Sequence, residues 1–212
     1  MSERLLKSLP KSTKNSVWQL SGFRQKFIIV IVALIVMLSV MPFFFDFIQQ
    51  RHGTLLNDWL LNSLPAIDFS IPIFAILYGL AGWLVFRAYQ NPRIVINFGM
   101  AYFLVTLSRA ITIMLFPLEP PLHLVDMIDP ITGIFYGGKP ITRDLFYSGH
   151  TSTVFLIYLS LYTKTERAIA LAGTILLGIL LLFQHIHYTI DVLVAFPVPY
   201  LIFLLTKKWT GV

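Results

Sequence analysis

The chain has 212 residues, of which 57% are hydrophobic and only 12% are charged, and its formal net charge is +6. A soluble domain of this length carries roughly twice that charged fraction, so the composition argues against a soluble globular fold and indicates a hydrocarbon environment. The absence of cysteine excludes disulfides and thiolate metal sites.

Long apolar runs predict an all-α integral membrane protein, because backbone groups that face lipid must be paired within helices. The first run follows a basic N-terminal segment, residues 1–26, and has no small-residue cleavage site, so we expect a retained span. The predicted fold is a six-transmembrane-helix bundle over residues 27–206, with a short tail at 207–212. The six helices are expected at residues 27–45, 70–89, 94–116, 146–163, 167–185 and 188–206.

The basic residues predict how this bundle is oriented. With the N-terminus inside, the outer segments hold only Arg51, Lys139 and Arg143, and Arg109 lies within the third span. The positive-inside rule therefore places both termini in the cytoplasm. Because the positive charge is divided among membrane-flanking loops, it suits anionic inner-leaflet lipid and argues against nucleic acid as a partner. The inner cationic residues are Arg4, Lys7, Lys11, Lys14, Arg24, Lys26, Arg87, Arg93, Lys164, Arg167, Lys207 and Lys208.

Two polar segments are expected at the outer ends of the fourth and sixth helices: Asp-Leu-Phe-Tyr-Ser-Gly-His-Thr, residues 144–151, and His-Tyr-Thr-Ile-Asp, residues 187–191. One helical turn separates His187 from Asp191, so the carboxylate can bind one ring nitrogen and leave the other free to attack. Imidazole is a competent nucleophile toward phosphorus and would form a phosphohistidine. His150 would protonate the departing oxygen and later deprotonate an incoming hydroxyl. These residues predict a catalytic site for phosphoryl transfer.

Further residues are candidates for binding the substrate phosphate. Ser148 and Gly149 lie where a helix begins, and free N–H groups there favour an anion. Arg109 lies in the outer third of the third span, where an ionisable residue is costly and marks a functional site by default. Its guanidinium can hold phosphate oxygens, and Thr112, one turn outward, can add a hydroxyl. Asp144 is either a site residue or the N-cap of the fourth helix.

Simpler interpretations exist for each of these residues. Either histidine alone could be an ordinary interfacial residue, and Arg109 could snorkel or bridge helices. We expect His185 and His123 to be structural or solvated. A metal site of His185 with His187 is the alternative, but two residues at this spacing do not share a helix face. Asp68 is either a helix cap or part of an outer vestibule. We expect neither a metal nor a cofactor.

The two polar segments, together with Arg109-Ala-Ile-Thr112, resemble the sphingomyelin synthase family of the type 2 phosphatidic acid phosphatase superfamily over residues 60–195. The resemblance implies six spans, an active site opposite the cytoplasm, and transfer of a phospho-headgroup from a glycerophospholipid to ceramide with release of diacylglycerol. It also implies His187 as the nucleophile, Asp191 as its partner and His150 as the second histidine.

The chain also departs from the related families. Where the superfamily's general phosphatases carry a Ser-Arg pair, it has Leu180-Leu181, and it lacks their Lys-x6-Arg-Pro segment. These absences favour the synthase-like branch. In contrast, Thr142-Arg143 replaces the synthases' Cys-Gly, and Phe196-Pro-Val-Pro-Tyr200 replaces their basic and aromatic residues.

The main hypothesis is a lipid headgroup phosphotransferase that uses a phospholipid donor and an acceptor such as ceramide or a diacylglycerol-type lipid. If water is the acceptor, the enzyme is instead phospholipase C-like or a lipid phosphate phosphatase. A hypothesis of another class is a non-catalytic lipid-binding or lipid-transporting membrane protein. A bacterial inner membrane, a plasma membrane and a Golgi membrane all remain open, as does an oligomer.

Overall fold

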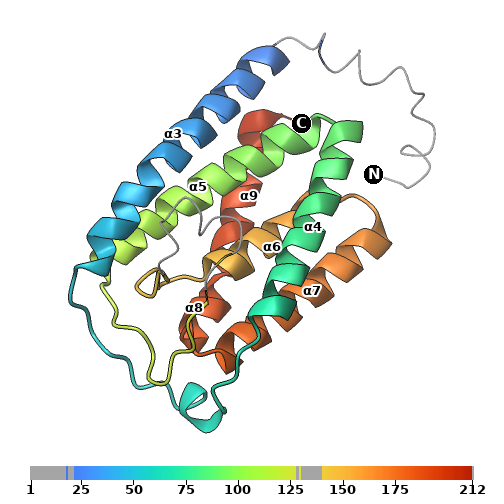
Figure 1. The fold of residues 1–212 in the computed structure, drawn as a ribbon. Helices are drawn as coiled ribbons and strands as arrows, with labels where there is room; N and C mark the ends of the chain where they lie inside the picture. The colour runs from blue at the N-terminus through green and yellow to red at the C-terminus, as the bar shows by residue number, and fades with distance from the viewer. Residues whose placement is uncertain (1–17, 19–21, 128, 130–139, 212) are drawn as a thin grey trace.

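The computed structural model describes residue 18 and residues 22–127, 129 and 140–211. The basic residues expected at positions 4, 7, 11 and 14, and Lys139 in the outer loop, lie outside the described residues. The described elements are helical, and Figure 1 shows them as a bundle. They are α3 (Phe23–Gln49), η1 (Leu61–Ser63), α4 (Ser70–Gln90), α5 (Arg93–Leu115), α6 (Gly149–Ser160), α7 (Lys164–Phe183), α8 (Thr189–Val194) and α9 (Pro197–Thr210).

Within the described residues, five segments are long and apolar enough to cross a membrane, which supports an integral membrane protein. They are α3, α4, α5, α7 and the stretch Thr189–Thr210, which contains α8 and α9. Helix α3 begins at Phe23, inside the expected basic segment, and α9 runs to Thr210, four residues beyond the expected end.

The expected fourth span is the main difference. Helix α6 has 12 residues, from Gly149 to Ser160, instead of the expected 146–163. At 1.5 Å per residue it is about 18 Å long, short of the roughly 30 Å of a hydrocarbon core. A sixth crossing by a single helix is therefore not confirmed. Helix α6 is instead the buried centre of the bundle, and it contacts α4, α5, α7 and α9.

The expected sixth span is broken. Helix α8 ends at Val194 and α9 begins at Pro197, so the chain turns at Ala195 and Phe196. Proline suits the first position of a helix, because its fixed φ fits there and its missing N–H would be unpaired anyway. The break separates a short helix that follows His187 from the longer α9.

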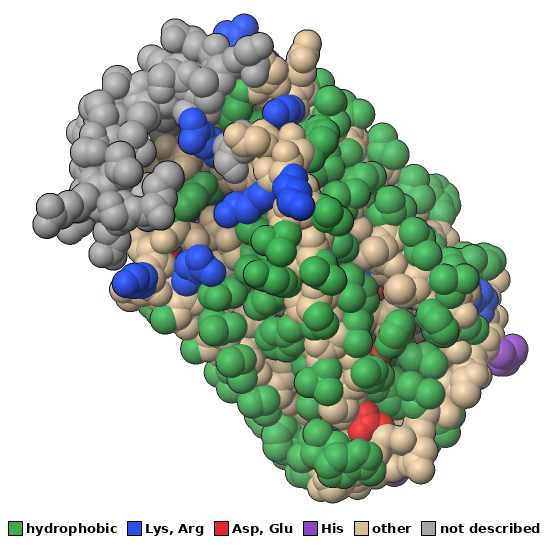
Figure 2. Space-filling view, turned by 180° about the vertical axis from the view of Figure 1, so that it is seen from behind, with side chains coloured by type: hydrophobic (Ala, Val, Ile, Leu, Met, Phe, Trp, Pro, Cys, Tyr) green, Lys and Arg blue, Asp and Glu red, His purple; other side chains and the backbone are tan. Residues whose placement is uncertain are grey.

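The helices alternate in direction and give the bundle two chemically distinct ends. The Lys26 ammonium donates to the Thr210 carbonyl at 2.8 Å, which joins the start of α3 to the end of α9. Arg87 near the end of α4 pairs with Glu166 near the start of α7. On the face shown in Figure 2, Lys and Arg side chains gather at one end and hydrophobic side chains cover the flank. We refer to this as the basic end.

The opposite end is formed by residues 50–69 and by the described parts of a second long connection, residues 116–127, 129 and 140–148. They pair through a bridge between Thr54 and Leu118, and the Thr54 N–H donates to the Pro117 carbonyl at 2.9 Å. The Ile67 N–H donates to the Phe183 carbonyl at the end of α7, also at 2.9 Å. The polar sequence segments lie at this end, at the start of α6 and the start of α8.

Candidate active site

Ser148 is the N-cap of helix α6. Its side-chain oxygen accepts from the Thr151 N–H at 3.3 Å, and its carbonyl accepts the first helical hydrogen bond, from the Ser152 N–H at 3.1 Å. Of the two alternatives for Asp144, the N-cap is therefore excluded, because Asp144 precedes the cap by four residues and binds Arg109 instead. The N–H groups of Gly149 and His150 belong to the first turn, which leaves them without intrahelical acceptors.

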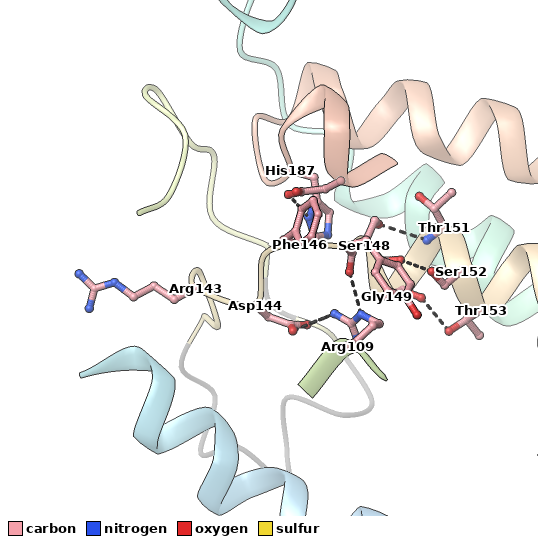
Figure 3. A network of polar contacts seen from close by, with 12 residues as sticks. Arg109, Arg143, Asp144, Phe146, Ser148, Gly149, Thr151, Ser152, Thr153 and His187 are labelled. Carbon is pink, nitrogen blue, oxygen red and sulfur yellow. Dashed lines mark hydrogen bonds and ion pairs between the residues drawn. The ribbon is translucent and has the colours of Figure 1, made fainter. Parts of the chain in front are cut away.

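Arg109 of α5 binds the segment in front of this helix (Figure 3). Its Nη2 donates to both carboxylate oxygens of Asp144 at 2.8 Å, and its Nε donates to the Tyr147 carbonyl at 2.7 Å. The residue is only 9% exposed. No described residue accepts a hydrogen bond from Nη1, and Arg109 lines a cavity. One edge of the guanidinium is thus held by protein and the other is left for a ligand.

Gly149 allows this close approach. A Cβ added at Gly149 would lie 2.6 Å from Nη1 and 2.7 Å from Cζ of Arg109. A larger residue would therefore push the guanidinium away from the start of α6. In this way the expected phosphate-binding residues Arg109, Gly149 and Asp144 are brought together.

Thr112 does not join this group. Its hydroxyl lies 2.7 Å from the carbonyl oxygen of Phe146 and 3.0 Å from that of Arg109. Thr112 is also absent from the described residues that line the cavities. Its hydroxyl thus ties the segment before α6 to α5, and a contact with phosphate stays a prediction.

His187 and Asp191 form a buried pair. The His187 Nδ1 lies 3.2 Å from the Asp191 Oδ2, which also accepts from the Tyr188 N–H at 3.2 Å. The interpretation that both lie on one helix is wrong, because α8 begins at Thr189 and His187 precedes it. The contact forms because Asp191, in the first turn, reaches back to the residues before the helix. With Nδ1 donating to the carboxylate, Nε2 carries the free lone pair.

Helices α6 and α8 meet directly. The Ser148 N–H donates to the Asp191 carbonyl at 3.0 Å, which joins the two sequence segments through the backbone. His150, His187 and Asp144 line a common cavity of about 40 Å³. His150 and Asp144 also line a second cavity of about 320 Å³, together with Arg109 and Gly149. The two histidines therefore face one space, which connects to the arginine through shared walls.

The larger cavity extends from the polar residues into the bundle. The ring of Phe74 on α4 lies edge-on to His150 with centroids 6.3 Å apart. The Tyr78 hydroxyl bonds to the carboxylate of Asp129, and both residues line the cavity. The apolar and aromatic walls come from α3, α4, α5 and the connection between α5 and α6, and consist of Phe45, Leu77, Tyr78, Ala81, Tyr102, Val105, Met127 and Ile141. Such a space suits a molecule with a phosphate and an apolar part.

Other polar residues at this end bind the connecting loops and not the cavity. Arg143 points away from Arg109 and Asp144 in Figure 3, and its Nη2 pairs with the Glu119 carboxylate at 2.8 Å. The Gly53 N–H and Arg143 together hold the pKa of Glu119 below its usual value. The ring nitrogens of His185 lie 2.9 Å from the Leu122 carbonyl and 3.2 Å from that of Leu64, a structural position. Among the described residues, no group of three or more His, Asp or Glu side chains is placed to hold a metal ion.

Sequence reasoning missed Asp58 in the connection between α3 and α4. Its carboxylate accepts from the Thr189 N–H at 2.6 Å and from the Thr189 hydroxyl at 3.0 Å. Burial alone would raise the pKa of this carboxyl, but hydrogen bonds from Thr189 and Leu61 outweigh burial and lower it. No local pattern could reveal a contact between residues so far apart in sequence. The only signal was an acid within an otherwise largely apolar loop.

Comparison with known families bears on this end of the chain. Residues 143–208 match the family model described as PAP2 superfamily C-terminal. The matched region includes His150, His187 and Asp191 but not Arg109. The match supports the type 2 phosphatidic acid phosphatase superfamily, and with it an enzyme of the lipid phosphatase or phosphotransferase type that acts on phospholipids in a membrane. No significant match was found among curated proteins.

Proposed function

We propose that this protein is a lipid headgroup phosphotransferase that moves a phospho-headgroup from a glycerophospholipid to a lipid hydroxyl, such as that of ceramide. The observation that carries the proposal is the His187–Asp191 pair, whose Nδ1 is bound and whose imidazole lines the same cavity as His150. The family match over residues 143–208 supports the general class of reaction.

The reaction would proceed in two displacements. In the first, the His187 Nε2 attacks phosphorus, the bond to the diacylglycerol oxygen breaks, and His150 donates a proton to that oxygen. In the second, His150 takes the proton of the acceptor hydroxyl, whose oxygen attacks the phosphohistidine and releases His187. Asp191 holds the proton on Nδ1 and stabilises the cation that forms on the ring.

The negative charge on the phosphoryl oxygens would be stabilised by hydrogen-bond donors at the start of α6. The open Nη1 edge of Arg109 and the first-turn N–H groups of Gly149 and His150 are donors that do not have to reorganise during the reaction. Asp144 holds the opposite edge of the guanidinium and so fixes its plane. Asp144 would act as a positioning residue, because its carboxylate would repel the phosphate.

The choice between a lipid and water as acceptor rests on the larger cavity. Its walls are mainly apolar and aromatic, which favours an acceptor with hydrocarbon chains. A monoesterase acting on phosphatidic acid is disfavoured, since a dianionic phosphate requires more positive charge than a diester. Among the described lining residues, the one Lys or Arg is Arg109, and Asp144 already neutralises it.

The orientation is part of the proposal. The basic end would face the cytoplasm, as the positive-inside rule predicts, and the active site would open on the opposite side. The donor lipid would keep its chains in the bilayer while its phosphate enters the space between His150 and Arg109.

The test is reconstitution into vesicles that contain fluorescent ceramide with phosphatidylcholine, phosphatidylethanolamine and phosphatidylglycerol, followed by separation of the lipid products. We expect a phosphosphingolipid and an equal amount of diacylglycerol. His187→Ala and His150→Ala should each reduce the rate at least about a thousandfold, the scale known for loss of a nucleophile or its proton-transfer partner.

The matched control is His52→Ala, which removes an imidazole whose side chain is 96% exposed. This variant should retain the parental rate. Diacylglycerol without a new sphingolipid would identify water as the acceptor, and phosphate release from phosphatidic acid would identify a monoesterase. If no lipid is converted, or if both site histidine variants behave like His52→Ala, the enzymatic proposal is wrong and a lipid-binding or lipid-transporting protein is favoured.

A further inference from the structure

The first outer connection is attached to the segment that carries His187. Four contacts join residues 56–67 to residues 183–189, and we refer to residues 56–67 as the outer strap. The Leu56 N–H donates to the Tyr188 hydroxyl at 3.2 Å, and the Asp58 carboxylate accepts from Thr189. The Leu64 carbonyl lies 3.2 Å from a ring nitrogen of His185, and the Ile67 N–H donates to the Phe183 carbonyl at 2.9 Å.

Asp58 is the charged contact in this group. One carboxylate oxygen accepts the Thr189 N–H at 2.6 Å, and the other lies 3.0 Å from the Thr189 hydroxyl and 3.1 Å from the Leu61 N–H. The carboxylate is therefore fixed to the strap on one side and to the first residue of α8 on the other. A carboxylate on a backbone N–H forms a stronger hydrogen bond than a neutral acceptor would.

The position of Thr189 connects this contact to the dyad. His187 precedes α8 by two residues, and Asp191 lies in its first turn. The two members of the dyad are linked in the chain by Tyr188, Thr189 and Ile190. The Asp191 carboxylate accepts from the Tyr188 N–H, and the Asp58 carboxylate accepts from the Thr189 N–H. A shift of Thr189 would therefore turn His187 relative to Asp191 and to the cavity.

We propose that Asp58 is a positioning residue for the phosphoryl-transfer site, because its carboxylate holds the first residue of α8 and so fixes the angle of the His187 ring. This inference rests on the proposed function for its catalytic readout. Asp58 does not line either cavity, so it would act through the dyad and make no contact with the lipid.

The experiment compares Asp58→Asn with Asp58→Glu and with the matched control Asp126→Asn, which neutralises an exposed acid of the other outer connection. In the vesicle assay, Asp58→Asn should lower kcat about tenfold with KM within twofold, because a misaligned nucleophile slows the chemical step without weakening binding. Asp58→Glu should recover part of the loss, and Asp126→Asn should retain the parental kcat.

A second readout does not depend on catalysis. Hydrogen–deuterium exchange of the peptide that contains the Thr189 amide should be faster in Asp58→Asn than in the parent, while peptides from α6 stay unchanged. If the parent converts lipid and Asp58→Asn matches Asp126→Asn in kcat, the inference is wrong while the proposed function stands. If the parent converts no lipid, the proposed function falls, and unchanged exchange at Thr189 would separately overturn the positioning contact.

Discussion

Two partly buried ion pairs, one toward each end of the bundle, join an arginine to a carboxylate from another segment. At the basic end, the Glu166 carboxylate receives Arg87, the Trp83 Nε1 at 3.0 Å and the Thr163 hydroxyl at 2.8 Å, and it completes the capping box of α7. At the other end, Arg109 binds Asp144 and the Tyr147 carbonyl, no described residue accepts from its Nη1, and the residue lines a cavity. The pairs are chemically alike, yet only Arg109 retains donors for a ligand.

This difference indicates that the Arg87–Glu166 pair is structural and that the Arg109–Asp144 pair belongs to the candidate active site. The Arg87–Glu166 pair fastens α4 to α7, and neither residue lines a described cavity. The Arg109–Asp144 pair instead places a guanidinium against the start of α6, where Gly149 leaves room for it. Of the two arginines, Arg109 is therefore the stronger functional candidate, because no described residue accepts a hydrogen bond from its Nη1.

The same substitution in both pairs tests the comparison most strongly. Arg109→Lys should lower kcat/KM about a hundredfold, or about 2.7 kcal/mol, because an ammonium keeps the charge but loses the planar fork. It cannot bind Asp144, the Tyr147 carbonyl and a phosphate at once. The measurement is the rate of headgroup transfer in vesicles for each variant at equal amounts of folded protein.

Arg87→Lys is the matched control and should retain kcat/KM within twofold, with some loss of thermal stability. Equal losses of activity in the two variants would contradict the distinction between the pairs. They would indicate that charge anywhere in the bundle sets the rate.

A smaller effect is expected from Gly149→Ala. The new methyl would lie 2.6 Å from the Nη1 of Arg109, so the guanidinium must retreat from the start of α6. We expect about a tenfold fall in kcat/KM, or about 1.4 kcal/mol, with some loss of stability, because the displaced guanidinium weakens its bonds to Asp144 and to the Tyr147 carbonyl. Gly82→Ala in α4, where an added Cβ meets nothing within 4 Å, is the control. Parental activity in Gly149→Ala would show that the position of Arg109 is not critical.

The sequence predicted α4 and α5 closely, and α3 and α7 within four residues at each end, because each is a single apolar run. Residues 70–89 and 94–116 correspond to α4 and α5 within one residue at each end. The short fourth helix was not predictable in this way. It is buried among other helices, and its start depends on the Ser148 cap, whereas hydropathy reports only the solvent around a segment. The break before Pro197 was visible in composition, but proline alone cannot distinguish a kink from a helix start.

The sequence could predict those parts of the candidate site whose residues lie in one short motif. The contact of His187 with Asp191 follows from spacing, although a capping geometry and not a continuous helix produces it. The sequence could not predict the Arg109–Asp144 pair or the Asp58–Thr189 contact, since tertiary packing brings together residues that are far apart in the chain. For the same reason the sequence left the role of Asp144 open between a site residue and a helix cap.

The smallest effect on activity is expected at the basic end, from Glu166→Gln. The glutamine oxygen can still accept from Trp83, but the ion pair with Arg87 and one half of the capping box are lost. Because the Arg87 side chain is 33% exposed, water replaces part of the lost interaction, and we expect a loss of about 1–2 kcal/mol. Thermal unfolding in detergent should therefore shift down by a few degrees, with kcat within twofold of the parent and Asp126→Asn unchanged in both. A variant that kept its unfolding temperature but lost activity tenfold would show that the basic end is coupled to the site, and that the two ion pairs do not divide into structure and function.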